Sequence, residues 1–298
     1  MVTLKHQLDK TDLEKPSRAV QSTSADIVYY RSLSDIPNAK LVEELMRLGA
    51  GSNGWQTPNM ESARPIIPFM EGRYKATDAL LMRSGVKQVV EFAAGFVPRG
   101  MNNPQWNFVH TEQDEDALRQ MRDITERIIS HQQSMPHFVR FDAVTGEGID
   151  SVMACLREEP VGVTHEGMFR YYPNQSKEKT GRLAKAFLER YGGLYVTPDI
   201  WTWQRVELLR RIDPEMDRER SRILSERTGR DLASFLFKDN AEAIELFGSR
   251  IGFGIEIYTI GSLVGNLSAV PVIFKDPDMA KLVDETIKRM EIWKMTLG

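Results

Sequence analysis

The stretch VVEFAAGFVPRG, residues 89–100, does most to decide the fold of this chain. It begins with two valines, reaches an acid at Glu91 and then turns through the small residues Ala93 and Gly95. A second apolar run follows and ends in another acid, Glu112. A strand, a tight turn, a helix and a second strand that ends in a carboxylate are the usual way in which an α/β protein holds a nucleotide-like ligand.

Apolar runs and amphipathic stretches alternate on both sides of this turn. The runs predict strands at 88–92, 106–111, 137–141, 160–165, 193–197, 255–260 and 292–297. The amphipathic stretches predict helices at 25–48 (broken at 36–37), 66–84, 114–133, 149–156, 179–191 and 278–290. Repeated strand–helix units favour a parallel sheet with helices on both faces. We therefore expect a Rossmann-like, mostly parallel seven-stranded sheet.

Two segments stand outside this alternation. Residues 1–24 are polar and predict a flexible N-terminal arm, which leaves 25–298 as a single domain with an N-terminal helical extension. Residues 200–248 are helical and heavily charged, so we expect a helical lid insertion there, with the charged run of 205–230 as a solvated face. Residues 49–58 are rich in Gly, Asn and Pro and predict a loop.

Bulk composition limits the possible partners. The chain has 298 residues, 41% hydrophobic content and a formal charge of −3, which fits a globular protein and gives no reason to expect nucleic acid or an anionic membrane. No apolar stretch approaches the roughly 20 residues of a membrane span, and the polar N-terminus does not resemble a secretory signal. The single cysteine, Cys155, excludes an intrachain disulfide and a cysteine-built metal site. We expect a cytoplasmic protein without a metal.

Every one of the first five predicted strands ends in a carboxylate. In an open α/β sheet, ligands bind at the carboxyl ends of the strands. Acids there repel phosphates and suit hydroxyls, amines and cations. The chain also lacks a P-loop and a full dinucleotide fingerprint, because Ala93 replaces the first glycine and residues 96–98 crowd the turn. These observations favour a phosphate-free nucleoside cofactor such as S-adenosylmethionine. The acids are Glu91, Glu112, Asp142, Glu166 and Asp199.

Four ordered motifs carry a resemblance to a known family. They are EGRYKATD (71–78), EFAAGFVPR (91–99), TEQD (111–114) and HEGMFRYY (165–172). Together they resemble the leucine carboxyl methyltransferase family, which includes the bacterial polyketide O-methyltransferase-like enzymes, over roughly residues 25–200. The resemblance implies a class I S-adenosylmethionine-dependent methyltransferase that transfers a methyl group to an oxygen of a small molecule.

The resemblance also implies roles for individual residues. Arg73 would hold the methionine carboxylate of the cofactor, and Ala93 and Gly95 would line the methionine. Glu112 would bind the ribose hydroxyls. Asp142 would lie beside the adenine, and Glu166 would face the methionine end of the cofactor. Gln113 and Ala143 complete the predicted cofactor site, together with Glu91, which we expect to orient the turn or Arg73. The chain departs from the family pattern at Ala93, where the family has glycine, and at Val97, where it has aspartate.

The catalytic residues are less defined by the sequence. The candidates are Glu166, His165 and Tyr171, and none of them is an unambiguous general base. The lack of a clear base favours a carboxyl or enolic oxygen as the methyl acceptor. Purely structural roles also remain open for two of the predicted site residues. Asp142 could cap the turn that follows its strand, and His165 could be a buried polar residue whose hydrogen bonds are satisfied within the protein. Two other functions also remain open: an NAD(P)-dependent oxidoreductase, and a non-catalytic relative that binds the cofactor or a partner.

Overall fold

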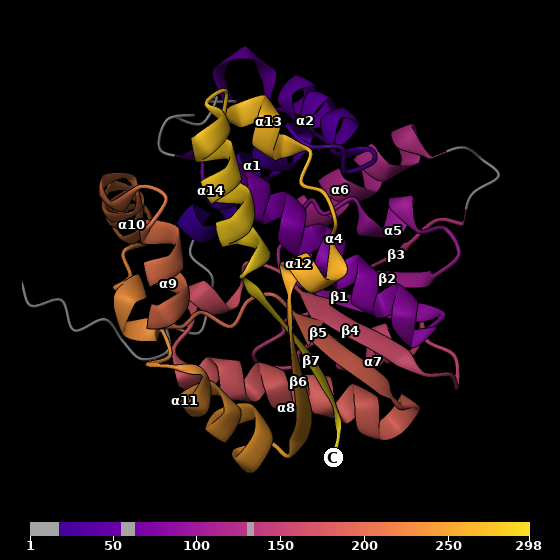
Figure 1. The fold of residues 1–298 in the computed structure, drawn as a ribbon. Helices are drawn as coiled ribbons and strands as arrows, with labels where there is room; N and C mark the ends of the chain where they lie inside the picture. The colour runs from indigo at the N-terminus through magenta and orange to yellow at the C-terminus, as the bar shows by residue number, and fades with distance from the viewer. Residues whose placement is uncertain (1–17, 55–62, 130–133) are drawn as a thin grey trace, which may run out of the picture.

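The computed structural model describes residues 18–54, 63–129 and 134–298. Its described residues form a seven-stranded sheet in the order β3-β2-β1-β4-β5-β7-β6. The strands β1 to β5 run parallel, and β7 is antiparallel to both β5 and β6. The predicted Rossmann-like, mostly parallel sheet is therefore confirmed (Figure 1). The strands are β1 (Gln88–Phe92), β2 (Asn107–Glu112), β3 (His137–Arg140), β4 (Val161–His165), β5 (Gly193–Thr197), β6 (Phe253–Thr259) and β7 (Glu291–Leu297).

The central strand β1 sets the register of the site. All its residues are buried, and Val90 pairs with Val109 of β2 and with Val163 of β4. Valine-rich strands covered on both faces are typical of parallel sheets. Because β1, β2 and β4 run in parallel, their carboxyl ends meet at one edge of the sheet, where Phe92 pairs with His165.

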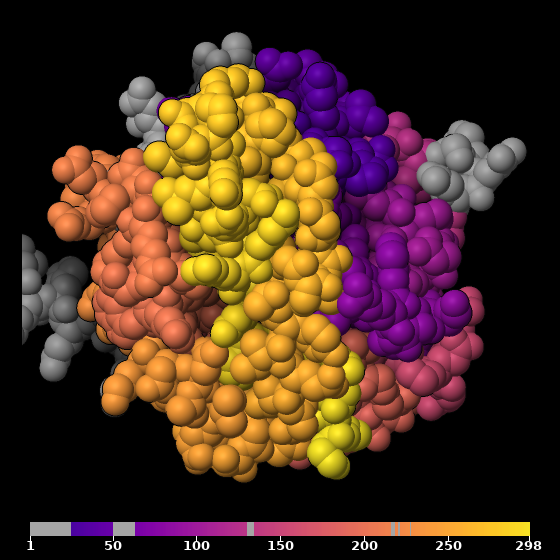
Figure 2. Space-filling view, viewed as in Figure 1, coloured from indigo at the N-terminus to yellow at the C-terminus, as the bar shows by residue number. Residues whose placement is uncertain are grey.

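One face of the sheet is covered by the long helix α4 (Ile66–Ser84) together with three C-terminal helices. These are α12 (Ile260–Leu263), α13 (Ala269–Ile273) and α14 (Pro277–Lys288). Phe69 and Leu81 of α4 are buried against this face with Val196 of β5. In the space-filling view, the C-terminal helices lie between α4 and the segment that follows β5 (Figure 2).

The opposite face is covered by α7 (Ile149–Met153), α8 (Asn174–Tyr191) and the π-helix η4 (Glu245–Arg250). Phe187 of α8 and Phe247 of η4 are buried there with Phe92 of β1. Figure 1 shows α8 and α4 on opposite sides of the sheet. The helix α8 begins at Asn174, five residues before the predicted start.

The N-terminal helices pack beside the sheet. The helices α1 (Arg18–Ser32) and α2 (Ala39–Gly54) contact each other, and α2 contacts α6 (Glu115–Ile128). The helix α1 begins inside the segment expected to be an arm, and residues 1–17 of that segment lie outside the described residues. The predicted loop at 49–58 is wrong as far as Gly54, because α2 continues through its glycines.

The segment between β5 and β6 is helical, as expected for the insertion. It contains α9 (Trp203–Arg210), α10 (Pro214–Thr228), the 3-10 turn η3 (Leu232–Phe235), α11 (Asn240–Ile244) and η4. The predicted solvated face holds for Arg222 but is wrong at both ends of the charged run, since Arg205 and Arg230 are only 5% and 7% exposed. None of the helices in the described ranges combines the length and apolarity that a membrane span requires.

Candidate functional site

The turn after β1 brings the backbone close to the carboxyl ends of the neighbouring strands. Ala93 has φ of 46° and Gly95 has φ of 54°, both in the left-handed region. The amide of Ala94 donates to the carbonyl of Thr111 at 2.8 Å and fixes the turn against β2. An alanine in this region is strained, because its methyl group approaches the backbone, whereas glycine is not. The departure at Ala93 therefore has a backbone cost.

His110 of β2 contacts this turn. Its Nε2 lies 2.8 Å from the carbonyl oxygen of Gly95, and its ring packs on Phe138. Burial lowers the pKa of His110 to about 4, so the neutral ring donates its Nε2–H to that carbonyl. His110 was not among the predicted site residues, and its position inside the buried run 108–111 of β2 is the only sequence signal for it.

The ends of β2 and β3 bring Glu112, Gln113 and Asp142 together. Glu112 accepts hydrogen bonds from the amides of Gln113 at 2.8 Å and Gly95 at 3.2 Å. The Gln113 side-chain amide donates to Asp142 Oδ2 at 3.0 Å. Burial raises the pKa of Glu112, and these amides offset part of the shift. Three of the residues that the resemblance assigns to the nucleoside thus form one cluster.

Asp142 also has the capping role that the sequence left open. Its Oδ1 accepts from the amides of Val144 and Thr145 at 2.8 and 3.1 Å. Ala143 is buried, and its carbonyl accepts from Thr180 Oγ1 at 2.7 Å. Since one oxygen of Asp142 caps the turn and the other faces Gln113, a structural role and a ligand role are compatible in this residue.

The end of β4 carries a buried ionic cluster. Glu166 Oε2 lies 2.9 Å from Arg31 Nη2 and 3.0 Å from Arg73 Nε, and its Oε1 accepts from Arg99. Burial by itself would raise the pKa of Glu166, but the guanidiniums of Arg99, Arg31 and Arg73 outweigh it and lower the pKa to about 2. The carboxylate of Glu166 is therefore ionised at any ordinary pH.

Arg99 connects this cluster to the motifs identified in the sequence. Its guanidinium is fully buried, donates to Glu91, Asp78 and Glu166, and lies 4.7 Å from the ring centre of Tyr74. Burial raises the pKa of Glu91 to about 7 in spite of Arg99. The motifs 71–78, 91–99 and 165–172 are thus physically joined by one arginine.

Several polar atoms of the cluster remain without a hydrogen-bond partner. The contact between Arg73 Nε and Glu166 has the distance of an ion pair but not the geometry of a hydrogen bond. Arg73 Nε, Arg31 Nε and Glu91 Oε2 are buried and have no hydrogen-bond partner within the described ranges. Buried polar atoms of this kind cost free energy unless a ligand or water satisfies them.

Arg31, Asp78 and Arg99 were not among the predicted site residues. Asp78 and Arg99 stand at the ends of two quoted motifs, so the fixed spacing of those motifs was the available signal. Arg31 lies on α1, 135 positions from Glu166, and no local pattern marks it.

His165 and Tyr171 lie in different surroundings. His165 is fully buried, with Nε2 at 2.6 Å from the Tyr195 hydroxyl and Nδ1 at 3.6 Å from Asp199 Oδ2. Burial lowers its pKa to about 4, so the ring is neutral. Tyr171 is in the short 3-10 turn η2 (Phe169–Tyr171), and its carbonyl accepts from Arg230 of the insertion. The two candidates therefore have different hydrogen-bond partners.

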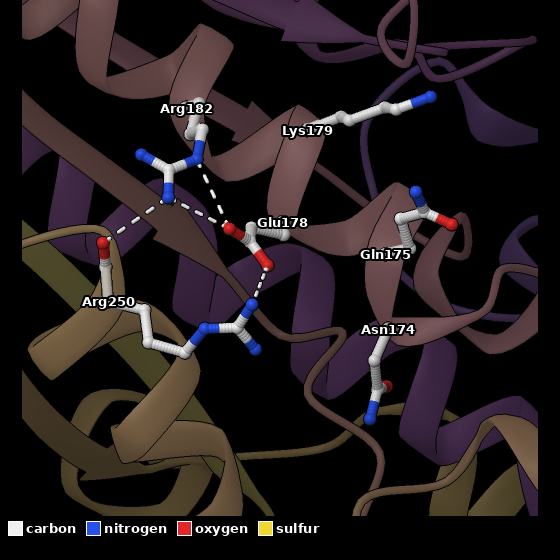
Figure 3. A pocket seen from close by; sticks show the side chains of 6 residues that line it. All are labelled: Asn174, Gln175, Glu178, Lys179, Arg182 and Arg250. Atoms are coloured by element: carbon white, nitrogen blue, oxygen red, sulfur yellow. Dashed lines mark hydrogen bonds and ion pairs between the residues drawn. The ribbon is translucent and has the colours of Figure 1, made fainter.

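A separate pocket of about 470 Å³ lies on the outside of α8 (Figure 3). Glu178 is held there between Arg182 Nη2 at 2.8 Å and Arg250 Nη2 at 2.6 Å. None of the strand-end acids lines this pocket, so it is separate from the ligand-binding edge expected at the carboxyl ends of the strands. No group of His, Cys, Asp and Glu suited to a metal ion occurs in the part of the chain that the structure describes.

Comparison with known proteins gives only distant similarity. No family model and no curated protein matches the chain. Among solved structures, the plantazolicin methyltransferase BpumL in complex with SAH is 9% identical, with 94% of this chain and 98% of that chain covered at a TM-score of 0.42. The magnesium protoporphyrin IX methyltransferase ChlM from Synechocystis PCC 6803 with bound SAH is 10% identical, with 92% and 100% covered at 0.45.

The glycopeptide N-methyltransferase MtfA is 12% identical, with 76% of this chain and 90% of that chain covered at a TM-score of 0.45. Similarity this distant does not determine the ligand or the reaction of this chain.

Proposed function

We propose that this chain is an S-adenosylmethionine-dependent methyltransferase that acts on a carboxyl or hydroxyl oxygen of a small molecule. The observation that carries the proposal is the pairing of two unlike clusters at one sheet edge. One cluster is the acidic group of Glu112, Gln113 and Asp142. The other is the arginine–carboxylate group around Glu166. A nucleoside linked to a zwitterionic amino acid has complementary groups for both.

The arginine–carboxylate cluster suits the amino-acid end of the cofactor. Arg31 and Arg73 each keep a buried Nε without a hydrogen-bond partner within the described ranges, which a carboxylate would satisfy. The ionised carboxylate of Glu166, with its pKa lowered to about 2, is a suitable acceptor for an ammonium group. We assign Arg31 and Arg73 to the carboxylate of the cofactor and Glu166 to its amino group.

The acidic cluster suits the nucleoside end. A carboxylate has about four lone-pair sites, and the amides of Gly95, Gln113 and Asp114 use three of them on Glu112. Glu112 can therefore accept from one ribose hydroxyl while it keeps these contacts, and from a second in place of the long 3.4 Å contact with Asp114. Asp142 and Gln113 supply an acceptor and donors for the adenine edge, next to Ala143. Phosphates would be repelled by Glu112 and Asp142, which disfavours a dinucleotide.

The bound cofactor would supply a methyl group on an electrophilic sulfonium. The residues of the chain would bind and orient the two reactants, which is the main source of rate in such a displacement. Two of the three catalytic candidates are poorly placed as a base, since His165 is enclosed by Tyr195 and Glu166 is paired with three arginines. An acceptor oxygen that is already acidic needs little help from a base.

A thermal-shift measurement with S-adenosylmethionine, S-adenosylhomocysteine and NAD tests this function. We expect the first two to raise Tm and NAD to leave it unchanged, because ligands stabilise the state that binds them. The variant Glu112→Ala should lose most of the shift. A shift with NAD alone would support the oxidoreductase instead. A shift with S-adenosylmethionine but no methyl transfer to any acceptor would support the non-catalytic relative.

A further inference from the structure

Arg205 is a buried arginine beside the proposed amino-acid end of the site. It lies in the first turn of α9, where its amide donates to the Thr202 side chain, and it is 5% exposed. Its Nη1 donates to the carbonyls of Pro198 and Ile200, the latter at 2.9 Å. One end of the guanidinium is thus used to hold the loop that follows β5.

The other edge of the same guanidinium is unused. Nε and Nη2 of Arg205 are buried, and neither has a hydrogen-bond partner within the described ranges. These two N–H groups point in parallel from one edge, so they can donate to the two oxygens of a carboxylate or phosphate. An arginine edge that is desolvated and unpaired is costly, so it suggests a ligand that supplies the missing charge.

The charges around Arg205 support the same conclusion. Burial lowers its pKa to about 10, the carboxylates of Asp199 and Glu291 oppose the shift, and Arg73 and Arg170 add to it. Asp199 already accepts from the Phe169 amide and from Trp201 Nε1. The positive charge of Arg205 is therefore not neutralised by a direct ion pair with a carboxylate of the described residues.

The position of Arg205 connects it to the reaction. Its guanidinium carbon lies 4.8 Å from the ring centre of Phe69, and that of Arg73 lies 5.7 Å from the same ring. Arg73 is the residue assigned above to the cofactor carboxylate. Arg205 also lies 4.8 Å from the ring centre of Trp201, at the start of the insertion. The guanidiniums of Arg205 and Arg73 thus contact the same Phe69 ring, which places Arg205 between the amino-acid end and the start of the insertion.

We propose that Nε and Nη2 of Arg205 bind a carboxylate of the methyl acceptor and anchor it. This inference rests on the proposed function and narrows its substrate class. A carboxylate paired with a guanidinium is a weakened nucleophile, so the methylated oxygen lies elsewhere in the molecule. The acceptor is therefore a hydroxy acid or a diacid rather than a neutral alcohol.

Binding requires a movement of the loop after β5, because the protein covers this edge. The bridge between Thr202 and Phe237 closes that loop against the later part of the insertion. In this proposal, the insertion must separate at this bridge to admit the acid.

A nuclear magnetic resonance titration tests the anchor directly. Protein labelled with ¹⁵N-arginine and saturated with S-adenosylhomocysteine is titrated with salicylate, a hydroxy acid, and with its neutral analogue salicylamide. The Nε–H signal that disappears in Arg205→Lys identifies Arg205. We expect salicylate, and not salicylamide, to shift this signal, with roughly tenfold tighter binding of the acid.

The variants separate an anchor from a structural role. Arg205→Gln should remove the preference for salicylate and leave the affinity for S-adenosylhomocysteine within about twofold of the wild type. Arg222→Gln, at an exposed arginine of the same insertion, should change neither. If Arg205→Gln does not fold, Arg205→Lys, which keeps the charge and loses the paired edge, must show a reduced preference.

Two results would overturn the anchor: no preference for salicylate in the wild type, or an unchanged preference in the Arg205 variants. Failure of the wild type to bind S-adenosylhomocysteine would instead contradict the proposed function. The same titration of the free protein would then still decide whether Arg205 binds the acid.

Discussion

The two ends of the strand-end site are built from different interactions. At the nucleoside end, Glu112 and Asp142 accept mainly from backbone amides in the turns around them. At the amino-acid end, Glu166 is held by Arg31, Arg73 and Arg99, which come from three separate helices. The hydrogen-bonded partners named at the first end lie within 29 positions of each other, whereas the second end joins Arg31 to Glu166 across 135 positions.

Because of this difference, we expect substitutions at the two ends to have different effects on ligand affinity and on folding stability. Backbone amides of a turn stay in place when one carboxylate is removed, so changes at the nucleoside end should act mainly on the ligand. Three buried guanidiniums around one carboxylate depend on it for charge compensation. Changes at the amino-acid end should therefore act strongly on folding as well.

The largest effect is expected for Glu166→Gln. The substitution keeps the shape of the side chain but leaves buried arginines without their shared counter-ion, which should lower the free energy of unfolding by about 3–5 kcal/mol. Chemical denaturation measures it. The matched control is Glu178→Gln, because Glu178 also bridges two arginines but both are exposed. The control substitution should lower the free energy of unfolding by less than about 1 kcal/mol. Equal losses of stability in the two variants would contradict the claim that the amino-acid end depends on its buried carboxylate.

One buried histidine lies beside each end and makes stability depend on pH. The pKa of His110 and of His165 is lowered from 6.5 to about 4 by burial, so both are neutral in the folded chain. Their contribution is complete above pH 6.5 and is lost as the pH falls toward 4. We expect the free energy of unfolding to fall by up to about 1.4 kcal/mol per pH unit for each histidine.

Denaturation curves between pH 7 and 4 measure this dependence. His165→Gln should reduce the slope by one proton, because the variant lacks the group whose pKa is lowered in the folded chain. A slope that stays the same in His165→Gln would show that His165 does not titrate with unfolding.

A smaller effect on stability, with a clear effect on affinity, is expected for Glu112→Ala. Loss of charge-assisted hydrogen bonds to the ribose should weaken S-adenosylhomocysteine binding by about 1.5–3 kcal/mol. Calorimetry measures it, with the exposed Glu115→Ala as the neighbouring control. Unchanged affinity would remove Glu112 from the ribose site.

The smallest effect is expected in the turn between the two ends. Ala93→Gly relieves a left-handed alanine with φ of 46° and should raise the free energy of unfolding by up to about 1 kcal/mol. Ala94→Gly is the matched control, because Ala94 is not in that region and should lose about 0.5–1 kcal/mol. A lower free energy of unfolding for Ala93→Gly than for Ala94→Gly would contradict the backbone strain at Ala93.

The sequence predicted what depends on local periodicity. Strand positions followed from alternating apolar runs, and the acids at strand ends followed from the strands. The meeting of Glu112, Gln113 and Asp142 could therefore be anticipated, because parallel strands end at the same edge.

Long-range partners could not be predicted in the same way. Arg31 reaches Glu166 only through the packing of α1 on the domain. Arg205 was interpreted as part of a solvated charged run, because a single sequence does not show that the first turn of α9 is buried against Phe69 and Trp201.

The most direct test of the two-ended site compares two ligands by calorimetry. S-adenosylhomocysteine has both the nucleoside and the amino acid, whereas 5′-methylthioadenosine lacks the amino acid. We predict that the wild type binds S-adenosylhomocysteine at least about tenfold more tightly, and that Arg73→Gln removes most of this gap without weakening 5′-methylthioadenosine. Equal affinities of the wild type for the two ligands, or binding of NAD in place of both, would contradict the proposed site.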